Sequence, residues 1–388
     1  MSGFNYYQPT ELRFGNGRVR EVGREVARFG TRCLLVTAKA WPGVEPLYEG
    51  VKASLAESGV AVWHFDDVPP NPTTEVVARG AAVAKAHAVE VVLGLGGGSS
   101  MDTAKAIAVE ATHPGRVWDY LFYKRPQPDG RTLPVVAVTT TSGTGSQVTQ
   151  VAVVTDSERR DKSALYNPVL FPRVAIVDPE LMLSLPPYLT AATGFDTFTH
   201  AFESVLHSGA SPYTDLMAFE AIRLAVKYLP AARADGHDLE ARTGMAWADT
   251  LAGLCIANAG VSLPHGIGMA MGGMFPHVMH GEALAVVYPA VMRHTWREDV
   301  ARFARLARVV DPGGASTSEA AAAERCVDAI DAFLHRIGLH LTLDGLRVPR
   351  AELPALARQS LVLPDYKNHP KIVSAEEVQE ILEQSFGA

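Results

Sequence analysis

Two stretches of the sequence place an acid and several histidines at spacings that suit a metal ion. In "TGFDTFTHAFESVLHSG", Asp196 and His200 stand four positions apart with neither Gly nor Pro between them. If this run is helical, the two side chains share one face of the helix. A later stretch, "NAGVSLPHGIGMAMGGMFPHVMHGEALAVVYP", adds His265, His277 and His280. A carboxylate with three imidazoles is a donor set for Zn²⁺ or Fe²⁺.

Each of these residues also has a simpler interpretation. A single histidine is more often an ordinary buried or surface residue than a ligand, and Asp196 and His200 can bond each other on a helix face. Three features together favour a metal: the four-residue spacing, the glycine beside His265, and the pair His280-Gly281. Because no cysteine lies near them, a structural site built on thiolates is not expected.

The stretch "VVLGLGGGSSMDTAKAIAV" predicts a strand, a glycine turn and a helix. Its glycines, Gly94, Gly96, Gly97 and Gly98, fit neither G-x-G-x-x-G nor a P-loop. The free N–H groups at a helix start, together with the helix dipole, nevertheless favour a phosphate group. We therefore expect phosphate binding at this loop, with a plain tight turn as the alternative.

A second loop, "TTTSGTGSQVTQ", spans residues 139–150 and follows another apolar run. Its hydroxyl groups can bond phosphate, ribose or the carboxamide of nicotinamide. Taken alone this composition is a weak signal, because clusters of Ser, Thr and Gly are usually only loops.

The first half of the chain alternates strand-like and helix-like segments that would position these loops. Strands are predicted at 31–38, 60–66, 89–98, 133–141 and 173–179, and helices at 46–59 and 73–88. Such alternation predicts a mostly parallel sheet with helices on both faces. After residue 187 nearly every long segment has Ala, Leu and Met at helical spacing. We therefore predict an α/β domain over residues 1–182 and an all-α domain over residues 183–388.

Composition narrows the class of protein. A chain of 388 residues is too long for one ordinary core and suits two domains. The net charge of −7 and the lack of a basic stripe argue against nucleic-acid partners, and no apolar run approaches the length of a membrane span. The N-terminus lacks the pattern of a secretory signal, and Cys33, Cys255 and Cys326 form no C-x-x-C unit. We expect a cytoplasmic enzyme.

Five motifs in order resemble the iron-containing (group III) alcohol dehydrogenases, of the dehydroquinate-synthase-like superfamily. They are "GGGSSMDTAK", "TTTSGTGSQVT", "DKSALYNPVLFPRVAIVDPEL", "GFDTFTHAFES" and "PHGIGMAMGG…HGEALAVVYP". The resemblance extends over essentially the whole chain. It implies an N-terminal dinucleotide-binding α/β domain, an all-α metal-binding domain, NAD(P) and one divalent metal, Fe²⁺ or Zn²⁺.

The resemblance also implies site residues. The metal ligands would be Asp196, His200, His265 and His280. The cofactor-binding positions would be Asn71, Gly97, Gly98, Ser99, Asp102, Thr140, Thr141, Thr144 and Lys162, together with the end of the second strand at Ala38 and Lys39.

This sequence departs from the family pattern at three places. Many members have a second histidine, given a proton-relay role, where this chain has Met269; His277 is an extra histidine that is a candidate for that role. The spacing from Gly273 to His280 is one residue longer than usual. Many members also have Asp where this chain has Ala38, followed by Lys39. Because that carboxylate would repel the 2′-phosphate of NADP, its absence slightly favours NADP over NAD.

The function that follows is hydride transfer between NAD(P)(H) and a small alcohol or aldehyde, by a homodimer or higher homo-oligomer. Two alternative enzymes share parts of the pattern: a maleylacetate-reductase-like enzyme, and a dehydroquinate-synthase-like lyase with the same "HGEA" segment. A noncatalytic nucleotide-binding protein with a structural metal is the alternative from a different class.

Overall fold

The computed structural model describes residues 3–41, 43–314 and 318–387. Contacts divide the chain into two compact units. One runs from Tyr7 to Leu185, and the other contains the described residues from Pro186 onward together with residues 3–6. This division between Leu185 and Pro186 lies three residues after the boundary that we predicted from the sequence, between residues 182 and 183.

The first unit is built on a parallel sheet of six strands. The strands are β1 (Glu11–Phe14), β2 (Arg32–Val36), β3 (Ala61–Phe65), β4 (Val91–Gly96), β5 (Val135–Thr139) and β8 (Val174–Val177). Their order is β1-β8-β5-β4-β2-β3, and every neighbouring pair is parallel. The five predicted strands and the parallel sheet are thereby confirmed.

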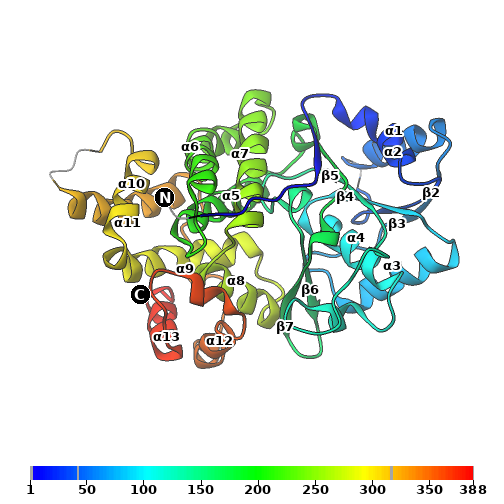
Figure 1. Cartoon of the computed structure of the whole chain (residues 1–388). Coiled ribbons are helices and arrows are strands. Elements are labelled where there is room, and N and C mark those ends of the chain that lie inside the picture. Colours follow the sequence, from blue (N-terminus) through cyan, green and yellow to red (C-terminus); the bar gives the residue numbers. More distant parts are fainter. Residues whose placement is uncertain (1–2, 42, 315–317, 388) are drawn as a thin grey trace. The chain divides into compact units, whose positions relative to one another are not determined.

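Helices cover both faces of this sheet (Figure 1). They are α1 (Val22–Ala27), α2 (Glu45–Glu57), α3 (Thr74–Ala86) and α4 (Gly98–Glu110). Alternate residues of β2 point to opposite faces: Cys33 and Leu35 pack in the core with α1 and α2, whereas Leu34 and Val36 pack in the core with α3 and α4. Two apolar faces explain why β2 is a continuous apolar run in the sequence.

A two-stranded antiparallel hairpin, which the sequence analysis did not predict, follows β5. Its strands are β6 (Val151–Asp156) and β7 (Asp161–Tyr166). Short 3₁₀ helices complete this unit at Arg18–Glu21, Val117–Tyr120, Ser146–Val148, Pro168–Leu170 and Pro179–Met182.

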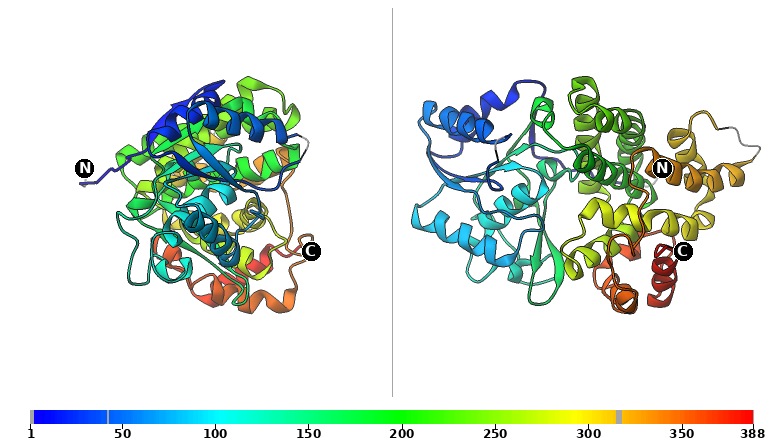
Figure 2. Two further views of the ribbon diagram at one scale, coloured as in Figure 1. Left: turned by 90° about the vertical axis from the view of Figure 1, so that its right-hand side faces the viewer. Right: turned by 180° about the vertical axis from the view of Figure 1, so that it is seen from behind.

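The second unit is helical, and none of its described residues lies in a strand (Figure 2). Its helices are α5 (Pro187–Leu206), α6 (Pro212–Ala234), α7 (Leu239–Asn258), α8 (Leu263–Met274), α9 (His280–Thr295), α10 (Val300–Val310), α11 (Glu319–Arg336), α12 (Leu353–Gln359) and α13 (Ala375–Gln384), with 3₁₀ turns at Trp296–Glu298, Arg350–Glu352 and Pro364–Asn368. No single described helix is long and apolar enough to cross a membrane; α7 and α8 pass this test of length and composition only when taken together, as a pair bent by 100°.

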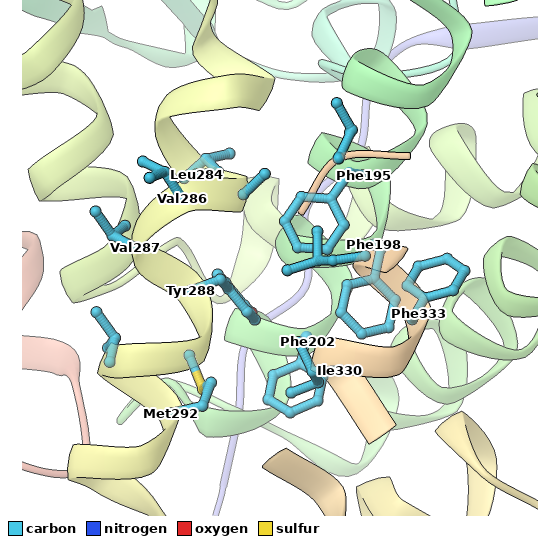
Figure 3. Close-up of a cluster of buried hydrophobic side chains, with 14 of the residues drawn as sticks. Phe195, Phe198, Phe202, Leu284, Val286, Val287, Tyr288, Met292, Ile330 and Phe333 are labelled. Atoms are coloured by element: carbon cyan, nitrogen blue, oxygen red, sulfur yellow. The ribbon is translucent and has the colours of Figure 1, made fainter. Parts of the chain in front are cut away.

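The aromatic side chains of α5 fix how this helix is rotated. Phe195, Phe198 and Phe202 are fully buried and lie against residues of α9 and α11 (Figure 3). Ring centroids are 5.5 Å apart for Phe195 and Tyr288, and 5.2 Å apart for Phe198 and Phe333. Because these rings occupy one side of α5, the polar residues between them face a different neighbour.

Candidate metal centre and nucleotide-binding loops

Three histidine side chains converge on one carboxylate oxygen in the helical unit. Asp196 Oδ1 lies 3.5 Å from His200 Nε2, 3.4 Å from His265 Nε2 and 3.8 Å from His280 Nε2. Asp196 and His200 come from the middle of α5, His265 from the first turn of α8, and His280 is the first residue of α9. The structure therefore brings together the four residues that the family resemblance implies as metal ligands, and not His277.

The chemistry of this cluster fits a divalent metal ion. Asp196 and His265 are buried, and among the described residues neither Asp196 Oδ1 nor His265 Nε2 has a hydrogen-bond partner. A buried carboxylate oxygen without a donor is costly, and a cation between Asp196 Oδ1 and His265 Nε2 would satisfy both atoms. A carboxylate oxygen with imidazole nitrogens is also a donor set that binds iron and zinc.

The electrostatics of the cluster favour an ionised carboxylate. Burial opposes ionisation of Asp196, but the imidazoles of His200, His280 and His265 outweigh it and hold the pKa of Asp196 below its usual value. Burial likewise opposes charging of His265, but the carboxylates of Glu203 and Asp196 raise the pKa of its ring to about 10. Metal binding at His265 must therefore displace a proton.

A second buried carboxylate, Glu203, orients the His265 ring. Glu203 Oε1 lies 2.7 Å from His265 Nδ1, and Oε2 accepts from the backbone N–H of Ser262 at 2.8 Å and from its hydroxyl at 3.1 Å. The hydrogen bond at Nδ1 directs Nε2 toward Asp196, in the way carboxylates orient metal-binding histidines. The network continues through Ser262 Oγ to His369 Nδ1 at 3.1 Å, and through His369 Nε2 to the Thr295 hydroxyl at 2.8 Å.

The candidate proton-relay histidine lies outside this cluster. His277 is exposed, and its Nε2 is 3.0 Å from the carbonyl oxygen of Leu346. Met269 is buried and has no group that titrates. The proton-relay role of His277 stays a prediction.

The glycine loop and the hydroxyl loop contact each other at the carboxyl ends of β4 and β5. The backbone N–H of Thr140 donates to Gly96 O at 3.0 Å. A Cβ atom on Gly97 would lie 3.2 Å from Thr141 Cγ2, and one on Gly98 would lie 2.5 Å from Thr144 Cγ2. Helix α4 begins at Gly98, and no side chain caps its start. Its N-terminal N–H groups therefore point into the region where the two loops meet, and anionic ligands favour such positions.

A buried lysine on α4 connects the helix that follows the glycine loop to the hydroxyl loop. Lys105, on α4, donates from Nζ to the carbonyl oxygens of Ser146, Thr149 and Val151 at 2.7, 2.9 and 2.7 Å. The Ser146 hydroxyl accepts from Lys105 at 2.9 Å and donates to Asp102 Oδ1 at 2.6 Å. Burial lowers the pKa of Lys105 to about 8, although the charge of Asp102 opposes this shift.

Asp102 is thus engaged within the protein. Its second oxygen accepts from the backbone N–H of Val153 at 3.0 Å. Burial raises the pKa of Asp102, against the opposing effect of Lys105. Two other predicted cofactor positions meet nearby, because Lys162 Nζ donates to Asn71 Oδ1 at 2.8 Å. Asn71 has a left-handed backbone, with φ of 54°, a conformation that Asn tolerates better than most residues.

The end of β2 lies beside β4 and has no acidic side chain. The Thr37 hydroxyl donates to Ala38 O at 2.7 Å and lies 2.9 Å from His64 Nε2. Lys39 is exposed. The nearest acids in sequence, Asp66 and Asp67, follow the neighbouring strand β3 and are also exposed.

Two features together are those of a nucleotide-dependent metalloenzyme. One is a parallel sheet with an uncapped helix after a glycine turn, and the other is a helical unit with a buried carboxylate and three histidines. Comparison with known proteins makes the class specific. The model of the iron-containing alcohol dehydrogenases matches residues 9–179, and that of the C-terminal part of the Fe-containing alcohol dehydrogenase family matches residues 190–386. The chain belongs to the iron-containing alcohol dehydrogenase family, and it is an oxidoreductase.

Individual relatives are similar over most of their length. The NAD-dependent methanol dehydrogenase of Bacillus methanolicus is 35% identical over 98% of this chain and 100% of its own. The choline dehydrogenase of Bacillus subtilis is 41% identical over 83% of this chain and 81% of its own. The crystal structure of an archaeal halo-thermophilic alcohol dehydrogenase from a Red Sea brine pool covers 100% of both chains at 34% identity, with a TM-score of 0.95. These similarities do not favour the maleylacetate-reductase-like or dehydroquinate-synthase-like alternatives.

Sequence reasoning missed two residues of these sites, Glu203 and Lys105. Glu203 stands three positions after His200, and this spacing places it on the same face of α5. That spacing was a usable signal, but a glutamate on a helix is usually at the surface. Lys105 follows Asp102 by three positions, and its sequence context alone is that of an ordinary exposed lysine.

Proposed function

We propose that this chain transfers a hydride between a nicotinamide dinucleotide and a small alcohol or aldehyde, with one divalent iron ion held by Asp196, His200, His265 and His280. The observation that supports it most is the convergence of three imidazole nitrogens on Asp196 Oδ1, at 3.4–3.8 Å. Membership of an iron-containing family favours iron over zinc.

The bound metal would supply Lewis acidity at the substrate oxygen, and the nicotinamide would supply or accept the hydride. The chain's own residues prepare that chemistry. Asp196 contributes a negative charge in a buried site, and Glu203 holds the His265 ring with Nε2 directed at Asp196. Because four protein ligands would fill a tetrahedral site, substrate binding requires a fifth position or an exchangeable ligand.

For the substrate we propose a small primary alcohol and its aldehyde. Relatives of nearly full length are named for methanol and for 1,3-propanediol, the latter from Klebsiella pneumoniae at 34% identity over 99% of both chains. The choline and long-chain-alcohol dehydrogenases among the relatives make the substrate panel wider than these two.

For the cofactor we propose that the glycine and hydroxyl loops hold the phosphates, and that NADP is accepted as well as NAD. Relatives are named for NAD. In this chain residues 37–39 have no carboxylate that would repel a 2′-phosphate, and Lys39 places a cation there. A strong preference for NAD would instead mean that another acid, such as Asp66 after β3, accepts a hydrogen bond from the adenosine ribose.

The test is activity of metal-free and iron-loaded protein with NAD, NADH, NADP and NADPH, against methanol, 1,3-propanediol, choline, a long-chain alcohol and their aldehydes. We expect turnover only in the loaded protein. Asp196→Ala should lose both metal and turnover, whereas His237→Ala, at an exposed position outside the cluster, should keep both. Equal turnover with and without metal would contradict the proposal, and cofactor binding without any turnover would favour the noncatalytic alternative.

Two further properties concern the assembly and the location of the chain. We propose a homodimer or higher homo-oligomer, which light scattering would test against the chain mass of 41.6 kDa. We also propose a cytoplasmic location, supported by the three buried cysteines, all free; burial raises the pKa of the Cys33 thiol to about 12.

A further inference from the structure

A second group of metal-binding side chains lies at the end of α11, on the surface of the helical unit. Asp331 Oδ2 is 3.8 Å from His335 Nε2, and Asp331 Oδ1 is 3.5 Å from His340 Nε2. One ligand atom from each residue lies within 4.8 Å of the others. Nothing in the proposed dehydrogenase function uses these three residues.

The backbone holds the three side chains together. Asp331 and His335 are four residues apart on α11 and so share one face. Helix α11 ends at Arg336, and Gly338 adopts φ of +67°, which turns the chain back. Leu339 N donates to Leu334 O at 2.9 Å, and the Leu339 side chain is fully buried. This anchor returns His340 to the last turn of the helix.

The two imidazole rings are stacked face to face, and both lie near the same carboxylate. Their centroids are 3.8 Å apart and the rings are inclined by 13°. Both Nε2 atoms lie near the carboxylate, and each is beside a different one of its two oxygens. Two donors bound to one tetrahedral Zn²⁺ stand roughly 3.3–3.6 Å apart, given metal–ligand bonds of about 2.0–2.2 Å. The separations of 3.8 and 3.5 Å are near that spacing, each to a different oxygen of Asp331, and one ligand atom from each of the three residues lies within 4.8 Å of the others.

We propose that Asp331, His335 and His340 form a second metal site, which binds a first-row divalent cation such as Zn²⁺. Imidazole and carboxylate donors suit such ions. The carboxyl end of a helix also favours a cation, because the unpaired carbonyl groups there give it negative character. The neighbouring Arg336 is directed elsewhere: its guanidinium lies 5.2 Å from the Phe333 ring and donates to Val226 O.

This site differs from the Asp196 centre in its exposure. The side chains of His335 and His340 are 60% and 45% exposed, whereas that of Asp196 is 4% exposed. Three protein donors leave the remaining positions to water. We therefore assign it exchangeable binding that would join the segment after α11 to the helix, and no part in hydride transfer.

The experiment is calorimetric titration of the iron-loaded protein with Zn²⁺, comparing wild type with Asp331→Asn, His335→Ala and His340→Ala. His237→Ala is the matched control, because it removes an exposed histidine outside the cluster. We expect one Zn²⁺ per chain in wild type and in the control, and at least tenfold weaker binding in each of the three variants. Circular dichroism should show that every variant is folded.

A Co²⁺ titration gives an independent measurement, because the visible absorption of cobalt reports its ligands. We expect wild type to develop a band that all three variants lack. If the iron-loaded wild type binds no Zn²⁺, or if the three variants bind Zn²⁺ as tightly as wild type, the proposed site does not exist. Iron content and dehydrogenase turnover should be the same in all five proteins, so failure of this proposal is distinguishable from failure of the Asp196 centre.

Discussion

The hydrogen bond between Glu203 and His265 would make the proposed metal site depend on a residue that is not one of its four proposed ligands. Glu203→Gln keeps the size of the side chain but removes the charge that holds the His265 ring. We expect metal affinity to fall roughly 10–100-fold, as for other carboxylates that orient metal-binding histidines. Measurement of metal content after dialysis against a graded chelator series would check this.

The control for this variant is Glu220→Gln, which removes an exposed carboxylate paired with Arg223. It should leave metal affinity unchanged. If Glu203→Gln holds iron as tightly as wild type, then the Glu203 bond is a structural contact only and has no effect on the ligand.

Lys105 holds the hydroxyl loop through three carbonyl oxygens in a fully buried position. Lys105→Met would remove the Nζ donor from those oxygens, and it would leave Lys162 as the remaining cation that favours the Asp102 carboxylate. We expect a loss of about 3–5 kcal/mol in the free energy of unfolding, the usual cost of removing one charge from a buried group of charges. Urea unfolding would measure it.

Lys85→Met is the matched control, because Lys85 is exposed on α3. Its effect should stay within about 0.5 kcal/mol. The double variant Asp102→Asn/Lys105→Met should be less destabilised than the sum of the single variants if the two charges interact. Strict additivity would show that they do not.

At the scale of elements, the packing of α5 against α9 contains one unsatisfied group. Tyr288 is fully buried among the phenylalanines, and among the described residues its hydroxyl has no hydrogen-bond partner. Tyr288→Phe removes a polar atom that folding takes out of water. We expect the free energy of unfolding to be unchanged or to rise by about 1 kcal/mol.

The comparison is Tyr120→Phe, where the hydroxyl of an equally buried tyrosine donates to Pro114 O at 2.5 Å. That change should cost about 1 kcal/mol. Thermal unfolding of both variants distinguishes the cases. A loss at Tyr288 as large as that at Tyr120 would mean that the Tyr288 hydroxyl is satisfied, for example by a buried water.

The contact between the glycine and hydroxyl loops predicts an effect on the cofactor. A side chain at Gly97 would press on Thr141 and enter the space before the start of α4. We expect Gly97→Leu to raise the KM for the dinucleotide roughly tenfold or more, which corresponds to about 1.4 kcal/mol of binding, while metal content stays unchanged.

Gly50→Leu is the matched control, because Gly50 is exposed on α2 and a Cβ atom there would meet nothing within 4 Å. It should leave the KM as in wild type. An unchanged KM in Gly97→Leu would mean that the phosphates bind elsewhere.

The elements differ in how well the sequence predicts them. The strands β2, β4 and β5 are short apolar runs beside glycine or hydroxyl clusters, and this local pattern was sufficient. The β6–β7 hairpin was not predicted, because "TDSERRDK" interrupts it with charges and carries no Asn-Gly or Asp-Gly turn.

Some contacts of the candidate site could be predicted from local spacing in the sequence, and others could not. Asp196 and His200 share a helix face, so their spacing alone predicts their proximity. His369 meets Ser262 and Thr295 only after the whole helical unit has folded, and no spacing in the sequence encodes that contact. The position of His277 on the surface likewise depends on where α8 ends and α9 begins.

For the whole molecule, His369 predicts how stability depends on pH. Burial lowers its pKa from 6.5 to about 4, so the folded chain keeps this ring neutral where the unfolded chain would protonate it. Between pH 6.5 and 4 the unfolded state binds more protons, and stability therefore falls as the pH is lowered through this range. From pH 7 to 5 this one group should cost on the order of 2 kcal/mol.

His369→Gln should be less stable than wild type at pH 7 but lose less stability on going to pH 5. Both proteins are compared metal-free, so that release of metal at low pH does not contribute. Urea unfolding at the two pH values checks the expectation. Parallel losses in the two proteins would contradict it, and would point to His207, whose pKa burial lowers to about 4 as well.

The order of the four proposed ligands along the chain has a consequence for how the enzyme would be made. Asp196 and His200 are synthesised first, and all of α6 and α7 follow before His265 leaves the ribosome. His280 comes later still, as the first residue of α9. A nascent chain therefore has only half of the ligand set until α5, α6 and α7 have been translated. Loading with iron would accordingly be a late event, and the fraction of chains loaded in a cell would report on the supply of metal after synthesis.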